Sequence, residues 1–423
     1  MSQLLTTKFV AKSLAATVSV LMLSTVANAA TADQKQIQQL RQEVETLKTL
    51  IQQQQQVQLQ QASQIEQVKA APQSGLAGLK SKAGSNVNIY GFVRADAQYQ
   101  IEGGDGIWSQ VNKAELGNGN SSEDKFYATA KTTRLGLDFK APVQGADVGG
   151  KVEVDFSQSD TKNDGGIRIR HAYLTYNNWL VGQTTSNFLS GSSVPEMIDF
   201  SSPLGIGTKR TPMVRYADKI NANTSYSVAL EKGADANRLP SATAKVVHNF
   251  DKASVSGRAL IQEARKADHT DADKEFGWGV ALGANFKPTD ALTLNADYSH
   301  VKGDSYLIGY TDNAYRTNNK GENKLVEFDA LTVGATYQFT PKLRSTLAYG
   351  TIIYDKDSGG NVDNFIDKGE GFNEKLQQAW FNVMYSPVKP ITFGAEYVYG
   401  KRDVVSGQKG YENHVGFMAK YDF

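Results

Sequence analysis

Arginines recur in the first half of the sequence, and apolar residues flank most of them. Arg94 lies between Val93 and Ala95, and the same pattern continues at Arg134, Arg168, Arg170 and Arg215. Successive side chains of a β-strand point to opposite faces, so the arginines would share one face and the apolar residues the other. A guanidinium group binds a carboxylate through two parallel hydrogen bonds. The spacing therefore predicts a basic surface that binds anions.

A serine- and glycine-rich segment, residues 187–211, follows Arg170 and carries charges of both signs. Its charged residues are Glu196, Asp199, Lys209 and Arg210. If this segment folds against the arginines, its two acids would face them while Lys209 and Arg210 extend the basic surface. Opposite unit charges 4 Å apart attract by about 4 kcal/mol at an effective dielectric constant of 20. We therefore expect a transverse field and a small anionic solute as the ligand.

A simpler interpretation is that the arginines are structural. Acidic residues occupy the same face of neighbouring segments, namely Asp96, Asp138, Glu153 and Asp155. Opposite charges on adjacent strands form cross-strand pairs that stabilise a sheet. The two interpretations are compatible, because a paired arginine can still line a surface.

The sequence contains no complete motif for catalysis, cofactor binding or metal binding. There is no cysteine and no Gly-x-Ser-x-Gly motif. The five histidines are dispersed without zinc-binding spacing, and alternation places His171 and His300 on the outward face. The segment Asp355–Gly359 is similar to a calcium loop, but Ile366 stands where a glutamate is required. We predict no catalytic residue, no cofactor and no metal site.

Composition alone suggests an ordinary soluble protein. The 423 residues include 45 Lys+Arg and 44 Asp+Glu, and the mean hydropathy is −0.42. These values exclude a protein with several transmembrane helices, which needs repeated apolar runs of about 20 residues. A net charge of +1 does not favour binding to nucleic acid.

The N-terminal residues have the features of an export signal. Lys8 and Lys12 precede the apolar stretch Leu14–Val26, and Ala27-Asn28-Ala29 supplies a small-x-small cleavage site. We predict that residues 1–29 are a signal peptide. The alternative is a buried N-terminal helix.

A glutamine-rich region follows, and residues 30–71 are predicted to form a coiled coil. Heptad positions a and d are occupied by Ile37, Leu40, Val44, Leu47, Ile51, Ile65 and Val68, with Gln54, Gln58 and Gln61 in the seam between them. The polar seam leaves a disordered tether as the alternative. Pro72 ends the helix, and residues 72–84 are predicted to be a linker.

From residue 85 to residue 423 the sequence predicts an all-β barrel. Sixteen segments alternate between apolar and polar residues, starting near residues 86, 125, 147, 167, 179, 212, 224, 240, 253, 275, 291, 326, 342, 375, 391 and 412. Long and short connections alternate along the chain, as in outer-membrane barrels with long external loops and short periplasmic turns. A sixteen-stranded antiparallel transmembrane barrel encloses an aqueous channel. We expect sixteen strands, give or take two.

Aromatic residues accompany the short connections. These connections are predicted at Ala141-Pro142, Asn177-Asn178, Asp251-Lys252, Lys287-Pro288, Thr340-Pro341 and Ser386-Pro387. Aromatic residues lie next to them or at the C-terminus, namely Phe139, Trp179, Phe250, Phe286, Phe339, Tyr385 and Phe423. Such a ring of aromatics is typical of a bilayer interface.

Three sequence segments carry a family resemblance. Ile167–Tyr173, then Trp179–Thr184 and then Val214–Tyr216 resemble the DcaP-like porins of the general trimeric porin superfamily. The resemblance implies a homotrimer of sixteen-stranded channels with an N-terminal coiled coil in the periplasm. It also implies uptake of small dicarboxylates or aromatic acids. In the outer membrane such a protein would contact lipid and lipopolysaccharide.

Three functions are candidates for such a barrel. A solute-selective porin with a basic lumen wall is the function that we predict. A structural anchor would use the coiled coil to hold peptidoglycan or a periplasmic partner. A barrel hydrolase would need a Ser–His pair on one face, which the sequence does not supply.

Overall fold

A computed structural model describes residues 79–80, 84–108, 110–117, 123–143, 145–158, 166–201, 203–207, 209–265, 274–303, 307–311, 314–317, 323–355 and 372–423. The predicted signal peptide, the coiled coil, most of the linker and the calcium-like segment after Asp355 lie outside these residues. Among the described residues, no helix has the length and apolar character needed to cross a membrane.

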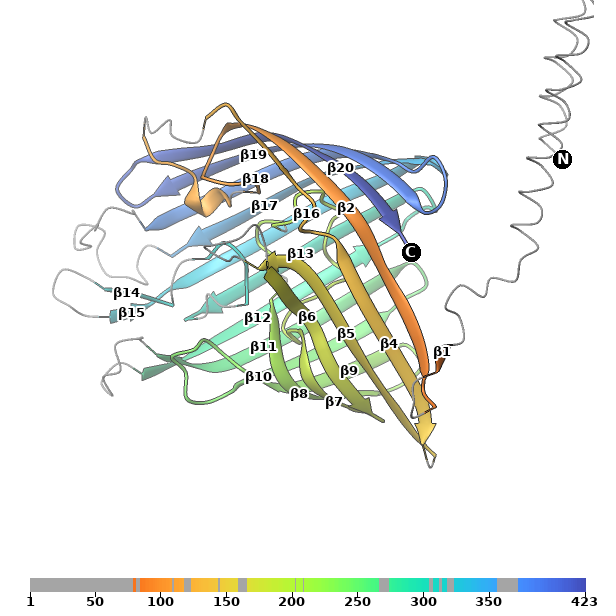
Figure 1. Ribbon diagram of the computed structural model, residues 1–423. Coiled ribbons are helices and arrows are strands. Elements are labelled where there is room, and N and C mark those ends of the chain that lie inside the picture. Colours follow the sequence, from red (N-terminus) through yellow and green to blue (C-terminus); the bar gives the residue numbers. More distant parts are fainter. Residues whose placement is uncertain are drawn as a thin grey trace, which may run out of the picture. The chain divides into compact units, whose positions relative to one another are not determined.

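A closed antiparallel barrel forms the described part of the chain (Figure 1). The wall strands are β2 (Asn86–Glu102), β3 (Lys125–Thr129), β4 (Arg134–Val143), β5 (Ala146–Gln158), β6 (Gly166–Tyr176), β7 (Trp179–Thr185), β8 (Arg210–Lys219), β9 (Thr224–Glu231), β10 (Ser241–Asn249), β11 (Ala253–Arg265), β12 (Lys274–Phe286), β13 (Leu292–Lys302), β16 (Glu327–Thr340), β17 (Leu343–Tyr354), β18 (Asn373–Tyr385), β19 (Ile391–Val404) and β20 (Lys409–Asp422). Because β3 and β4 both pair with β2 as two parts of one strand, the wall has sixteen strands. The fold class predicted for the barrel is confirmed.

The barrel closes where its first and last strands meet. β2 pairs with β20 through ten residue pairs, among them Val93 with Tyr421 and Ala97 with Phe417. Each predicted strand start lies within three residues of the observed one, and the largest difference is at the last strand, which begins at Lys409. Shorter elements lie outside this wall: β1 (Leu79–Lys80), β14 (Tyr315–Thr317), β15 (Asn323–Leu325) and the 3₁₀ turn η1 (Val111–Lys113).

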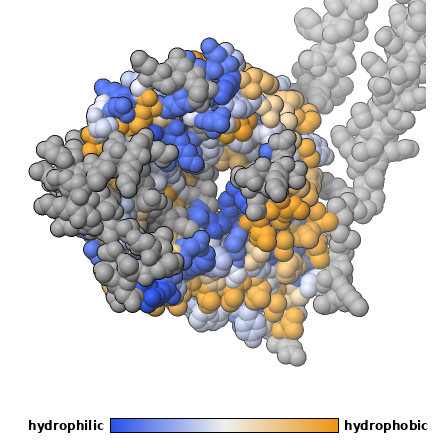
Figure 2. Space-filling view, turned by 60° about the vertical axis from the view of Figure 1, so that its left-hand side comes forward, coloured by the Kyte–Doolittle hydropathy of each residue, from blue (hydrophilic) through white to orange (hydrophobic). Residues whose placement is uncertain are grey.

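The outer surface of the barrel is apolar, as alternation predicts. Residues such as Val93, Leu135, Val152 and Ile167 are exposed, whereas Arg94 and Arg170 are 8% exposed. Figure 2 shows an opening with hydrophilic side chains around it and hydrophobic side chains on the outside of the wall. In a lipid bilayer a closed barrel of this kind leaves no backbone group without a hydrogen-bond partner.

The aromatic residues at the short turns are exposed, as an interfacial ring requires. Phe250, Phe286, Phe339 and Tyr385 are each 44–60% exposed. One predicted turn is misplaced. Ala141 and Pro142 lie inside β4, which ends at Val143, and β5 begins at Ala146 after Gly145, whose φ is +80°.

A β-bulge in β6 corrects the orientation predicted for one histidine. Arg170 is an extra residue opposite β5, because His171 pairs with Glu153 while Ile169 pairs with Val154. Such an insertion reverses the alternation beyond it. His171 therefore faces inward, with Nδ1 2.9 Å from the hydroxyl of Thr184. His300 faces outward as predicted, opposite the exposed Val280.

The segment between β7 and β8 folds into the barrel and lies against the inner wall. Phe188, Leu204 and Ile206 in this inner loop (residues 186–209) are at most 1% exposed. Two wall glycines provide the necessary space. A Cβ atom at Gly350 would lie 2.3 Å from the carbonyl oxygen of Leu204, and one at Gly334 would lie 2.6 Å from the Pro195 ring. The prediction that this segment folds inward is confirmed.

Candidate solute-binding site

Five of the seven predicted basic residues line a cavity inside the barrel. Its volume is about 1220 Å³, and it lies between the inner loop and the wall formed by β2 to β6. The charged residues that line it are Arg94, Lys131, Arg134, Arg168, Arg170, Asp199 and Arg210. Among the described residues, six positive groups and one negative group therefore contact the same space.

Carboxylates of the barrel wall form ion pairs with four of the arginines. The Arg94 Nη2 lies 2.6 Å from Asp96 Oδ1, and the Arg168 Nη2 lies 2.6 Å from Asp155 Oδ2. Arg170 contacts both Glu153 and Asp155 at 2.8 Å. Glu153 also lies 3.4 Å from Arg134 Nε. The structural interpretation therefore holds, and the paired arginines still face the cavity.

Arg210 differs from the other arginines of the cavity. It is the first residue of β8 and is more than half buried beside Arg134, Arg168 and Arg170. Within the described part of the chain, no carboxylate lies within ion-pair distance of its guanidinium group. A partly buried cation without a partner is electrostatically costly, so a bound anion would stabilise this position.

An aromatic residue of the inner loop lies opposite the arginines. The guanidinium carbons of Arg94, Arg168 and Arg170 lie 5.7, 5.9 and 5.8 Å from the centre of the Phe200 ring. Trp108 packs against the same ring with a centroid distance of 5.6 Å. Cation–π attraction to one ring gathers the three guanidinium groups.

The two loop acids do not form the acidic surface that the sequence predicts. Glu196 forms a two-bonded ion pair with Arg344 of β17, at 2.7 and 2.8 Å. Asp199 lines the cavity, but its Oδ2 points to His414 of β20 at 3.4 Å. Of the two acids, Asp199 alone lines the cavity among the described residues, where Phe200 lies beside the arginines. The expected transverse field stays a prediction.

Two other predicted residues lie apart from the main cavity. Arg215 does not line it. Lys209 lines an adjoining cavity of about 390 Å³, together with Arg168 and Arg210. Sequence reasoning missed Lys131, Trp108 and Phe200. Trp108 and Phe200 lie in loops, where strand alternation gives no information about orientation, and only their aromatic type in otherwise polar segments marks them.

The inner loop is fixed to the wall by many polar contacts. Arg258 Nη1 donates to the Phe188 carbonyl at 3.1 Å, and Ser193 Oγ donates to Asp297 Oδ2 at 2.5 Å. Further along, the Trp380 indole donates to the Glu196 carbonyl at 3.1 Å. Glu396 accepts the backbone N–H groups of Ile198 and Asp199 at 2.8 and 2.7 Å. These contacts hold Asp199 and Phe200 in place.

A closed sixteen-stranded barrel with an apolar outside, a polar inside and a loop folded into the lumen defines an outer-membrane porin. A family model described as DcaP outer membrane protein matches residues 19–423, and the chain belongs to this family. It is therefore an outer-membrane channel and not an enzyme.

Solved structures agree with this assignment. The chain is 48% identical to the outer membrane channel DcaP of Acinetobacter baumannii, with a TM-score of 0.76, covering 82% of this chain and 100% of that chain. An anion-selective porin from Comamonas acidovorans has 11% identity and a TM-score of 0.52, covering 80% and 100%. OmpT of Vibrio cholerae has 14% identity and a TM-score of 0.53, covering 82% and 99%. The last two show the fold alone. Comparison with curated protein sequences gave no match.

Proposed function

We propose that the channel conducts small anionic solutes and that dicarboxylates, aromatic ones included, are its preferred substrates. The observation that carries this proposal is Arg210, which has no carboxylate within ion-pair distance among the described residues and shares a cavity with Arg134, Arg168 and Arg170. An anion entering the cavity would pair with Arg210 without displacing a protein carboxylate. The paired arginines keep donors free, because a guanidinium group has five N–H bonds.

The spacing of the cationic groups supports a ligand with two carboxylates. Three guanidinium carbons lie within 5.9 Å of the Phe200 ring centre, so no two of them are more than about 12 Å apart. A short dicarboxylate would reach two guanidinium groups at once. The rings of Phe200 and Trp108 would contact the apolar body of an aromatic acid.

We infer that the functional unit is a homotrimer in the outer membrane, with the predicted coiled coil in the periplasm. This inference rests on the family resemblance and on the heptad pattern. Outer-membrane lipid and lipopolysaccharide would then surround the apolar outer surface.

The test is block of single-channel current by solutes of matched size. An aromatic dicarboxylate is added to one side of a planar bilayer, and the matching dialcohol serves as the neutral control. The dicarboxylate should interrupt the current at millimolar concentration, and Arg168→Ala with Arg170→Ala should weaken the interruption at least tenfold. Equal effects of the two solutes, or an unchanged double variant, would refute the proposal.

A further inference from the structure

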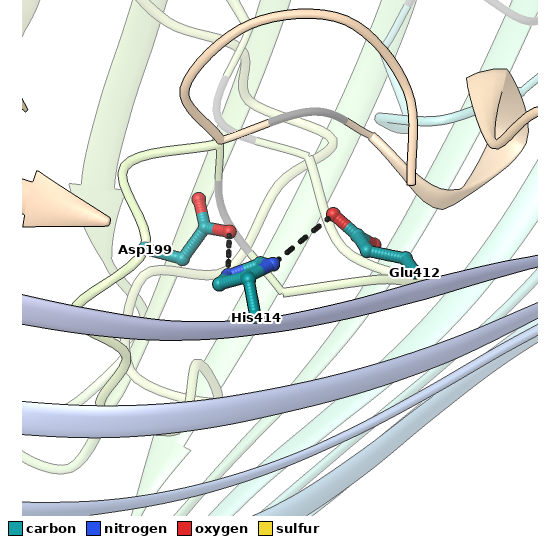
Figure 3. A group of neighbouring side chains, drawn as sticks. All are labelled: Asp199, Glu412 and His414. Carbon is teal, nitrogen blue, oxygen red and sulfur yellow. Dashed lines mark ion pairs between the residues drawn. The ribbon is translucent and has the colours of Figure 1, made fainter. Parts of the chain in front are cut away.

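Three buried ionisable side chains meet where the inner loop contacts the last strand. Asp199 belongs to the loop, and Glu412 and His414 lie two residues apart on the inner face of β20 (Figure 3). These residues are 5%, 0% and 1% exposed. One ligand atom from each residue lies within 4.8 Å of the other two.

The imidazole of His414 lies between the two carboxylates, within ion-pair distance of each (Figure 3). His414 Nε2 lies 3.4 Å from Asp199 Oδ2, and His414 Nδ1 lies 3.7 Å from Glu412 Oε1. Among the described residues, neither Asp199 Oδ2 nor His414 Nδ1 has a hydrogen-bond partner. Buried polar atoms without partners are rare and costly. Asp199 Oδ2 faces Nε2 of the ring, whereas Nδ1 faces Glu412 Oε1 on the other side of the ring.

A neighbouring carboxylate shows what a satisfied acid in this region looks like. Glu396 accepts three hydrogen bonds, two from the loop backbone and one from Asn382 Nδ2 at 2.9 Å. Asp199 uses only Oδ1 in this way, accepting the N–H of Ser201 at 2.7 Å. Glu396 therefore positions the loop, whereas Asp199 keeps one oxygen for another ligand.

We propose that Asp199, Glu412 and His414 bind a divalent transition-metal ion of the zinc type. Zinc–ligand distances of 2.0–2.2 Å place tetrahedral ligand atoms about 3.4 Å apart, which is the observed separation of His414 Nε2 and Asp199 Oδ2. Mixed imidazole and carboxylate ligands favour zinc, cobalt or nickel over calcium and magnesium. Glu412 completes the set after a side-chain rotation or orients the other ring nitrogen.

The ion would join the inner loop to the barrel wall. Asp199 belongs to the lining of the main cavity, so an ion bound to it would lie next to the lumen. Coordination would neutralise the one acid of the cavity lining and fix the loop beside Phe200. The proposal does not depend on which solute the channel conducts.

Cobalt binding to the full chain provides the direct test, because tetrahedral Co²⁺ absorbs visible light. Untagged protein in detergent is titrated with Co²⁺ and then with Zn²⁺. One Co²⁺ per chain should bind at micromolar concentration and give absorption between about 500 and 650 nm that Zn²⁺ removes. His414→Asn and Asp199→Asn should each weaken binding at least a hundredfold.

A matched variant controls for adventitious binding. His248 is a strand histidine whose ring contacts the Thr224 hydroxyl at 2.8 Å, and His248→Asn should bind Co²⁺ as the wild type does. Folding of each variant is checked by its heat-modifiable gel mobility, and Glu412→Gln replaces any variant that does not fold. Absence of binding below 1 mM, or equal loss in His248→Asn, would overturn the proposal.

Discussion

Replacing Arg210 with glutamine tests the role of the unpaired cation. The electrostatic interaction energy of a monovalent ion about 6 Å from a unit charge in water is about 0.7 kcal/mol. Beside Arg210 this energy is favourable for an anion and unfavourable for a cation. The anion-to-cation permeability ratio therefore changes by about 1.4 kcal/mol, or tenfold. Screening at 0.1 M salt, where the Debye length is about 10 Å, reduces the change to about fourfold. Arg210→Gln should lower the ratio by this amount.

The assay is the reversal potential in a tenfold gradient of potassium chloride across a planar bilayer. Lys219→Gln is the matched control, because it removes the same charge from the exposed other end of β8. Arg210→Gln should also raise the apparent Tm, since it removes repulsion from neighbouring arginines. An unchanged permeability ratio, or an equal change in Lys219→Gln, would refute the reasoning.

Four further predictions follow from the same geometry. Asp155→Asn removes the carboxylate that Arg168 and Arg170 share. It should lower the free energy of unfolding in urea by about 3–5 kcal/mol and raise the preference of the channel for anions. Unchanged stability would show that these ion pairs are not structural. Gly350→Val places a Cβ atom 2.3 Å from the Leu204 carbonyl, so the inner loop must move toward the lumen and single-channel conductance should fall; equal or higher conductance would contradict the packing. Phe200→Ala removes contacts worth about 0.5–1 kcal/mol each, and it should weaken current block by an aromatic dicarboxylate more than by an aliphatic one; equal weakening would assign the ring a purely structural role. Deleting residues 30–71 should leave conductance unchanged and lower the stability of the trimer measured by light scattering; loss of conductance would make the segment part of the channel.

Strand alternation was sufficient to predict the barrel wall. The pattern at Arg94, Arg134 and Arg168 identified the inward face because each alternates with apolar neighbours, and in β6 this alternation holds up to Arg170. The same logic failed at His171, since the extra residue Arg170 in β6 reverses the alternation beyond it. A one-residue insertion leaves no mark in the composition of a strand, so the sequence could not reveal it.

The inner loop was predictable in position but not in contacts. The segment after the fifth predicted strand was expected to fold against the face that carries the arginines. Which side chain faces which wall depends on pairs far apart in sequence, such as Glu196 with Arg344 and Asp199 with His414. Residue type alone does not show which side chains of a loop face a cavity. The loop backbone decides this, and here it places the Phe200 ring beside the arginines.

The central claim is that the lumen favours anions over cations, and the reversal potential of the wild-type channel tests it most directly. Purified protein in a planar bilayer under a tenfold potassium chloride gradient should give stepwise conductance. Its reversal potential should have the same sign as the equilibrium potential of chloride. A reversal potential of the opposite sign, set by potassium, would contradict the assignment of the arginine-lined cavity as an anion pathway.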